Sequence, residues 1–177
     1  QEEIVNARAH VICLMGVMGH VVGDAAQPLH TTRHYNGWVG PNPRGYTTNR
    51  TFHAWIDGGY LRKVGLDLHA LRPRLRPAQR LSANDPTTPR PEVFFIALDF
   101  IQQQHRHVET LYQLEKTGQL SGDGETGRAG LELLNDQLLK AAQWLGDLWL
   151  TAWLEAPPDL FLKSYLARHR DSLEPSP

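Results

Sequence analysis

Two histidine–aspartate pairs share one spacing in this sequence. His20 is followed four residues later by Asp24, and His53 is followed four residues later by Asp57. Residues four apart project from one face of an α-helix, with Cβ atoms about 5–6 Å apart, so each pair can offer two ligands to one metal ion. Imidazole nitrogens and carboxylate oxygens are zinc ligands in proteins. Helical ion pairs have the same spacing, however, so the pairs alone do not establish a metal site.

A further histidine strengthens the metal interpretation. His30 follows Asp24 by six residues and comes just after Pro28, which disfavours helix at the preceding residue. We therefore expect three elements to converge in one small volume: the end of a first helix, the segment with His30, and the segment with His53 and Asp57. Three protein ligands with a fourth position open to water or substrate are the pattern of a catalytic zinc site. The sequence thus predicts one complete zinc site.

Composition limits what else the chain can do. Cys13 is the only cysteine, so no intrachain disulfide can form and a zinc site must use histidine and carboxylate ligands. The 18 basic and 19 acidic side chains give a formal net charge of −1, so any affinity for phosphate must be local. The longest apolar run, residues 11–22, is shorter than the roughly 20 residues of a membrane span, so we expect no transmembrane segment.

The candidate ligands lie at the ends of a predicted helix and a long loop. Apolar residues recur at helical spacing from residue 2, and Pro28 limits this helix to about residues 2–26. Residues 31–50 are rich in Gly, Pro and Asn and have no sustained period. A connection this long inside a compact domain is usually functional or disordered, so we expect a zinc ion to tie down its ends.

The rest of the chain is also predicted to be helical. A second helix should begin at Asn49 or Thr51 and end or loosen at Gly58 and Gly59, with helical sequence again over residues 60–71. Residues 72–91 should then form an extended connection with solvated arginines. Two long amphipathic helices follow across 93–111 and 131–148, with a turn between them at 118–127. A last packed helix is expected at 159–172. No segment has strand alternation with hairpin turns. We predict an all-α fold in a single helical zinc-binding domain over residues 1–177.

The sequence GHVVGDAAQPLH, at residues 19–30, carries His20, Asp24 and His30 in that order, and the His53–Asp57 pair follows. This arrangement resembles the signature of the zinc-dependent phospholipase C and S-one/P-one single-strand nuclease superfamily. The motif residues span about residues 19–57, and the helical remainder of the chain also fits. The resemblance implies a multi-helix bundle of that type, whose members hold three zinc ions.

Matched residue by residue, the resemblance implies a role for each candidate ligand. His20 would bind one zinc of a close pair, and Asp24 would bridge that pair as the catalytic ligand. His30, His53 and Asp57 would hold the separate third zinc, which is the one site that is complete in this chain. The chemistry implied is zinc-assisted hydrolysis of a phosphodiester, without a covalent enzyme intermediate.

The chain departs from the family pattern before His20. The close zinc pair of the family also uses an amino-terminal tryptophan, an early histidine, and a further aspartate and histidine, none of which has a counterpart upstream of His20. We therefore expect this chain to be the carboxy-terminal, motif-bearing part of a longer enzyme, lacking the family's N-terminal helices. A secreted or periplasmic location is implied by the resemblance alone, since no signal is visible in this chain.

Two features favour the nuclease branch. Asp57 stands where the phospholipases typically place glutamate, and the loop between His30 and His53 is longer than theirs. This loop also carries side chains that could contact the phosphates and stack the bases of a single strand, although ordinary loop packing explains them equally well. They are Arg33, Tyr35 and Trp38.

Three functional hypotheses follow. The first is a zinc-dependent nuclease acting on single-stranded nucleic acid or nucleotides. The alternative enzyme is a zinc-dependent phospholipase C. The alternative from another class is a non-catalytic helical domain in which one zinc ion is structural. The sequence determines neither the oligomeric state nor whether Asn49, which begins a glycosylation motif, is modified.

Overall fold

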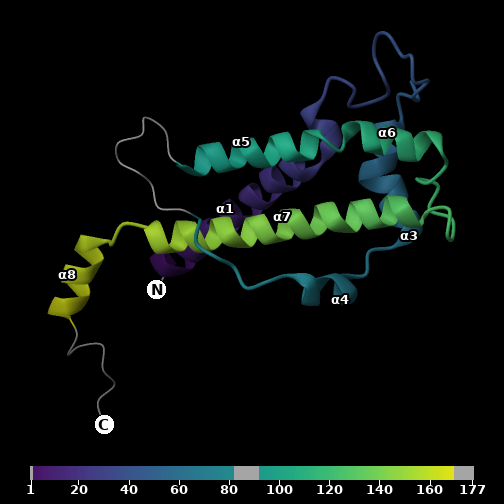
Figure 1. Ribbon diagram of the computed structural model, residues 1–177. Coiled ribbons are helices and arrows are strands. Elements are labelled where there is room, and N and C mark those ends of the chain that lie inside the picture. The colour runs from purple at the N-terminus through teal and green to yellow at the C-terminus, as the bar shows by residue number, and fades with distance from the viewer. Residues whose placement is uncertain (1, 82–91, 170–177) are drawn as a thin grey trace.

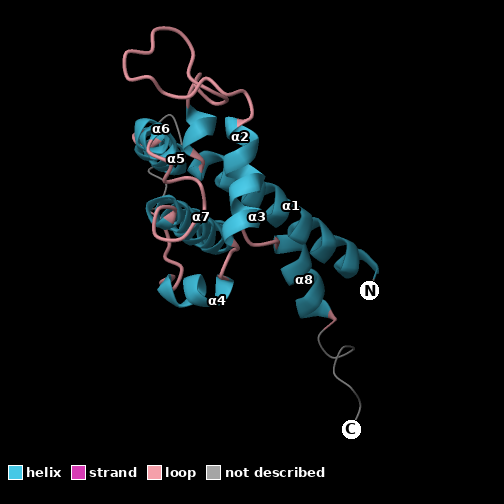
Figure 2. Cartoon of the chain, turned by 90° about the vertical axis from the view of Figure 1, so that its right-hand side faces the viewer, coloured by secondary structure: helices cyan, strands magenta, loops and turns pink. Residues whose placement is uncertain are grey.

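The structure is a computed structural model that describes residues 2–81 and 92–169, and helices dominate it (Figures 1 and 2). No β-strand occurs in these two ranges, so the all-α prediction is confirmed. Helix α1 spans Glu2–Ala26, as predicted. The chain leaves it at Gln27, whose backbone is extended because Pro28 follows, and Pro28–Thr31 then form one 3-10 turn, η1.

Two layers of helices form the body of the molecule. Helices α5 (Glu92–His105) and α6 (Val108–Lys116) follow one another above the long α7 (Arg128–Glu155), and α1 packs across α5 and α7 (Figure 1). The amphipathic stretch predicted at residues 93–111 is thus divided in two. The division falls at Arg106 and His107, where the polar sequence turns and the backbone N–H of His107 donates to the carbonyl of Gln104 at 3.0 Å.

The segment after the long loop is helical, as predicted. Thr51 precedes α2 (Phe52–Ala54), which continues through a π-helical turn, η2 (Trp55–Tyr60), into α3 (Leu61–Val64). Gly58 and Gly59 were expected to end or loosen the helix, and they loosen it: both lie in the wider π-helical turn and the helix continues beyond them. Glycine is also needed for space, because a Cβ atom on Gly59 would lie 2.4 Å from the Trp55 ring.

The break comes later, at a different glycine. Gly65 adopts a φ of +73°, a conformation that glycine takes without strain, and it separates α3 from the short α4 (Leu68–Leu71). Asp67 caps α4, because its carboxylate accepts from the Ala70 N–H at 3.0 Å. A 3-10 turn, η3 (Arg72–Arg74), follows directly. The helix expected at residues 60–71 is therefore two short helices.

The connection after η3 was expected to carry solvated arginines; the Arg76 side chain is 49% exposed, as expected, but it also has an ionic partner. Its guanidinium lies 2.8 Å from the carboxylate of Asp147, a side chain only 5% exposed on α7. The backbone N–H of Gln79 donates to the same carboxylate at 2.7 Å, and that of Leu81 donates to Thr151 at 2.9 Å. This connection is therefore held on α7. The arginine of the same connection at residue 90 lies outside the described residues.

The main core lies at the loop end of the molecule. Tyr60 and Tyr112 are fully buried there, and the Tyr112 ring contacts Phe52, Tyr46 and Trp38. The opposite end is less packed: α8 (Leu160–Arg168) projects away from the body (Figure 2), with Leu160 and Tyr165 exposed. The prediction that this last helix packs Leu160 and Tyr165 is wrong, because both side chains are exposed.

Helix α1 alone, among residues 2–81 and 92–169, is long and apolar enough to cross a membrane. The core helix of a soluble protein and a signal sequence meet the same criterion, so the chain has no clear transmembrane segment. Helix α1 nevertheless exposes large apolar side chains around most of its circumference. They are Ile4, Val5, Val11, Ile12, Leu14, Val17 and Val21.

Candidate metal centre

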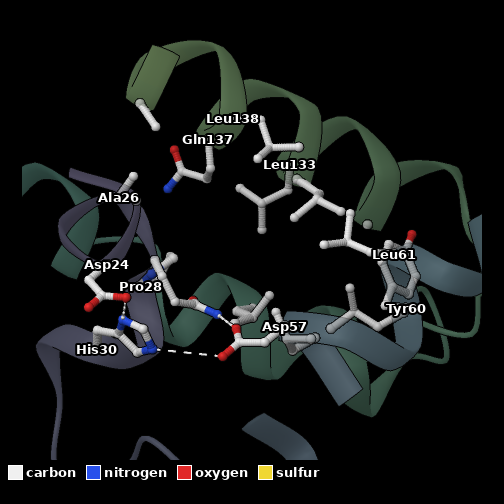
Figure 3. Close-up of a pocket in the computed structure, with 18 residues that line it drawn as sticks. Asp24, Ala26, Pro28, His30, Asp57, Tyr60, Leu61, Leu133, Gln137 and Leu138 are labelled. Atoms are coloured by element: carbon white, nitrogen blue, oxygen red, sulfur yellow. Dashed lines mark hydrogen bonds and ion pairs between the residues drawn. The ribbon is translucent and has the colours of Figure 1, made fainter. Parts of the chain in front are cut away.

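Three predicted ligands come together from three elements. His30 lies on η1, His53 on α2 and Asp57 on η2, and Figure 3 shows His30 facing Asp57. The Nε2 atoms of the two histidines are 3.0 Å apart. The Asp57 Oδ2 atom lies 2.7 Å from the Nε2 of His53 and 3.8 Å from that of His30. These are the only three histidine, cysteine or carboxylate side chains in the described ranges close enough to share a metal ion.

The separation of these atoms fits one zinc ion. Ligand atoms that each lie about 2 Å from a zinc ion can be at most about 4 Å from one another, and all three distances are within that limit. Two imidazoles and a carboxylate also form a common zinc donor set. The side chains of His30 and His53 are 29% and 22% exposed, so a fourth position can reach solvent. The residues present therefore fit a bound zinc ion.

The Nδ1 atoms of both imidazoles have hydrogen-bond partners that leave the Nε2 atoms able to bind metal. His53 Nδ1 lies 3.1 Å from the carbonyl oxygen of Tyr35, and His30 Nδ1 lies 3.2 Å from the Asp24 carboxylate. Both partners only accept hydrogen bonds, so each Nδ1 carries a proton and donates. In this tautomer it is Nε2 that presents the unshared electron pair of the ring. Three acceptor atoms face one point, and a cation there satisfies all of them.

Gln27 links the two halves of the centre, and the spacing of the histidines gave no sign of it. Its Nε2 donates to the Asp57 Oδ1 at 2.5 Å, which leaves Oδ2 facing the histidines. Its Oε1 accepts from the Leu29 N–H at 3.0 Å and so caps the turn that carries His30. Only its place directly before Pro28 could have suggested the capping role.

The second predicted pair lies apart from this cluster. His20 Nε2 is 3.3 Å from the Asp24 Oδ2, and the His20 side chain is 78% exposed. Asp24 contacts both histidines of its own segment, since its other oxygen faces His30. The structure thus gives Asp24 the position of a hydrogen-bond partner to a ligand. The predictions that His20 binds metal and that Asp24 bridges two zinc ions stay predictions.

The loop residues proposed to bind substrate have different surroundings. Tyr35 is 54% exposed, and its ring lies edge-on to His53 with centroids 6.0 Å apart. Trp38 instead stacks on His34 at 3.9 Å and donates to the Pro41 carbonyl at 2.9 Å, as a side chain that holds the loop together. Arg33 is exposed. Of the three, Tyr35 is nearest to the candidate ligands.

His34 itself is held in its neutral form. Burial, and secondly the positive charge of Arg33, lower the pKa of this histidine below its usual value of 6.5. Its Nδ1 also accepts a hydrogen bond from the Val39 N–H at 3.0 Å, which a protonated nitrogen cannot do. The loop next to the centre therefore depends on a neutral imidazole.

A cavity of about 230 Å³ adjoins the centre. His30, Asp57 and Asp24 form one wall, and leucines of α3 and α7 form much of the rest (Figure 3). Gln137 of α7 also lines it and is 6% exposed, yet neither its amide oxygen nor its amide nitrogen has a hydrogen-bond partner within the described structure. Leaving a buried amide unpaired costs about 1–3 kcal/mol.

Comparison with protein-family models, with curated proteins and with solved structures found no significant match to this chain.

Proposed function

We propose that this chain carries the zinc-binding part of a phosphodiester hydrolase acting on single-stranded nucleic acid or nucleotides. The single observation that supports the proposal most is the convergence of His30, His53 and Asp57 beside a cavity that can admit a substrate. The resemblance of residues 19–57 to the phospholipase C and S-one/P-one nuclease superfamily supplies the reaction class.

Each residue of the centre has a defined task in this proposal. His30, His53 and Asp57 hold the zinc ion, whose chemistry when bound is to stabilise charge on a phosphoryl group and to lower the pKa of water. Asp24 fixes the tautomer of His30 through Nδ1. Gln27 fixes the rotation of the Asp57 carboxylate. The partial exposure of the centre leaves room for a phosphate group.

Elemental analysis combined with hydrolysis assays tests this proposal. Protein purified without chelator is analysed for zinc and then assayed with bis(p-nitrophenyl) phosphate and a single-stranded oligonucleotide, with and without added zinc. We expect at least one zinc per chain and, in the full-length protein, zinc-dependent hydrolysis. A chain without zinc contradicts the proposal, and faster hydrolysis of phosphatidylcholine than of the oligonucleotide would favour the phospholipase alternative.

Asp24→Asn separates catalysis from folding. If Asp24 is the bridging ligand that the resemblance implies, this variant abolishes hydrolysis in the full-length protein while its helical circular dichroism is unchanged. Unchanged turnover would contradict the bridging role.

The structural-zinc hypothesis has its own supporting observation. The three ligands connect the end of α1 to α2 across the loop at residues 32–51, and Tyr35 and Asn36 of that loop accept hydrogen bonds from His53. A zinc ion there would tie all three segments together. Zinc in stoichiometric amount, with no hydrolysis by the full-length protein and a lower melting temperature after chelation, would favour this alternative.

A further inference from the structure

The cavity beside the metal centre has two chemically different parts. Leu61, Leu133, Leu134 and Leu138 give it apolar walls, and Figure 3 shows Leu133 and Leu138 on the α7 side, with His30 and Asp57 on the side opposite. An engineered apolar cavity of about 150 Å³ is large enough to bind benzene. This cavity, at about 230 Å³, therefore has room for a ring larger than benzene.

Gln137 makes the cavity more than an apolar space. It is more than nine-tenths buried, and its carboxamide lies over the space between α7 and the end of α1 (Figure 3). Neither its donor nor its acceptor atom has a partner within the described residues. Buried polar groups in native proteins are nearly always hydrogen-bonded, so both atoms of this amide call for a partner that the described residues do not supply.

A carboxamide selects its partner by geometry. Its oxygen accepts and its nitrogen donates, side by side, so its full complement is a group with an adjacent donor and acceptor in one plane. The edges of nucleobases have this pattern, and glutamine pairs with adenine through two such bonds. An acyl chain would fill the apolar part but would leave the amide of Gln137 unpaired. The chemistry of the cavity therefore favours a flat heterocycle over a lipid tail.

We propose that this cavity binds a nucleobase, whose faces lie against the leucines and whose hydrogen-bonding edge pairs with Gln137. The inference rests on the proposed function for its biological meaning, because a nucleotide carries its phosphate on the same molecule as its base, and two of the candidate metal ligands, His30 and Asp57, line the same cavity. Gln137 is then a specificity residue, distant in sequence from the metal motif.

Nucleoside binding tests the pocket without the metal. Adenosine and uridine, which lack phosphate, are titrated into the whole chain and followed by ligand-detected NMR. The central variant is Gln137→Met, which keeps the length of the side chain and removes both polar atoms. We expect it to weaken the binding of the nucleoside that binds best at least tenfold. Gln113→Met, on the exposed surface of α6, is the matched control and should bind as the parent does.

Two further measurements make the outcomes distinct. Gln137→Met should raise the melting temperature of the free protein, because it removes two unpaired buried atoms, and that result also shows that the variant folds. His53→Ala should lose zinc and hydrolysis yet retain nucleoside binding, so failure of the hydrolase proposal is separable from failure of the pocket. Absence of nucleoside binding by the parent, or equal binding by Gln137→Met, overturns the inference. Direct binding of laurate that Gln137→Met does not weaken, with no nucleoside binding, would show a lipid pocket instead.

Discussion

The two histidine–aspartate pairs have the same spacing but different surroundings. His53 and Asp57 meet His30. His53 is hydrogen-bonded to the loop at Tyr35, Asp57 is hydrogen-bonded to Gln27, and Asp57 also lines a cavity. His20 and Asp24 lie on the open side of α1, where the His20 ring has only Asp24 as an ionic partner among the described residues. Four-residue spacing therefore places two ligands on one helix face. A metal site also needs another element of the chain that brings a third ligand to them.

The two pairs also differ in the packing of the residues next to them. The His53–Asp57 pair is part of the segment that packs Phe52, Ile56 and Tyr60 into the core. Residues on either side of His20, by contrast, are exposed apolar side chains such as Val17 and Val21. A ligand that is held by a core keeps its geometry at low entropic cost, and an exposed one does not. Variants in the two regions should therefore behave differently.

Zinc affinity should show the largest contrast. His53→Ala removes one of three ligands and should weaken zinc binding by more than about 100-fold, since loss of an outer partner alone costs about 10–100-fold. His20→Ala should leave the first zinc equivalent bound. Competition with a chromophoric chelator measures both affinities. Equal losses in the two variants would mean that His20 belongs to the same site, and the distinction between the pairs would fail.

Gln27 should be the next most important residue for zinc affinity. Gln27→Ala removes the hydrogen bond to Asp57 and the cap on the Leu29 N–H, so zinc binding should weaken by about 10–100-fold. The matched control is Gln103→Ala, which removes a glutamine–aspartate hydrogen bond of 2.7 Å on the exposed surface of α5. The same chelator competition applies. An unchanged affinity in Gln27→Ala would show that Asp57 needs no such support.

Two glycine substitutions compare how tightly the His53–Asp57 segment and helix α1 are packed. Gly59→Ala places a Cβ atom 2.4 Å from the Trp55 ring and should destabilise the fold by about 1–3 kcal/mol. Gly16→Ala on α1 meets no atom within 4 Å and should stabilise the fold by up to about 1 kcal/mol. Urea unfolding followed by circular dichroism measures both. Effects of the same sign would contradict the described difference in packing.

Mild acid should produce the smallest change in the free energy of unfolding, and this change should come from the loop that carries His34. Because the folded pKa of His34 is lowered by burial and by Arg33, the unfolded chain takes up the proton first as the pH falls below about 6.5. The stability that His34 contributes is therefore present at higher pH and is lost as the pH falls through that value towards the folded pKa. His34→Phe keeps the stack on Trp38 but cannot titrate.

Urea unfolding at pH 7.5 and at pH 5.5 checks this expectation. The parent should lose more stability between the two pH values than His34→Phe does, because the other titrating groups are common to both proteins. Equal losses would show that protonation of His34 does not weaken the loop.

Local chemistry made part of the fold predictable. Pro28 cannot follow a helical residue without a clash, so the end of α1 near Ala26 was readable from the sequence. At Gly58 and Gly59 the sequence left a helix end and a loosened helix both open, and only the structure shows a π-helical turn with Gly59 against the Trp55 ring. The ionic partner of Arg76 was not foreseen because that partner, Asp147, is 71 residues away.

The sequence by itself determined the helical class, the first helix, the long loop and the three candidate ligands, because periodicity, proline and residue type act over a few neighbours. The tertiary structure decided which ligands meet. It also decided that Gln27 and Tyr35 orient them and that Gln137 lines the cavity beside them. These relations join residues from different elements, so their distances depend on how the helices pack, which no local pattern records.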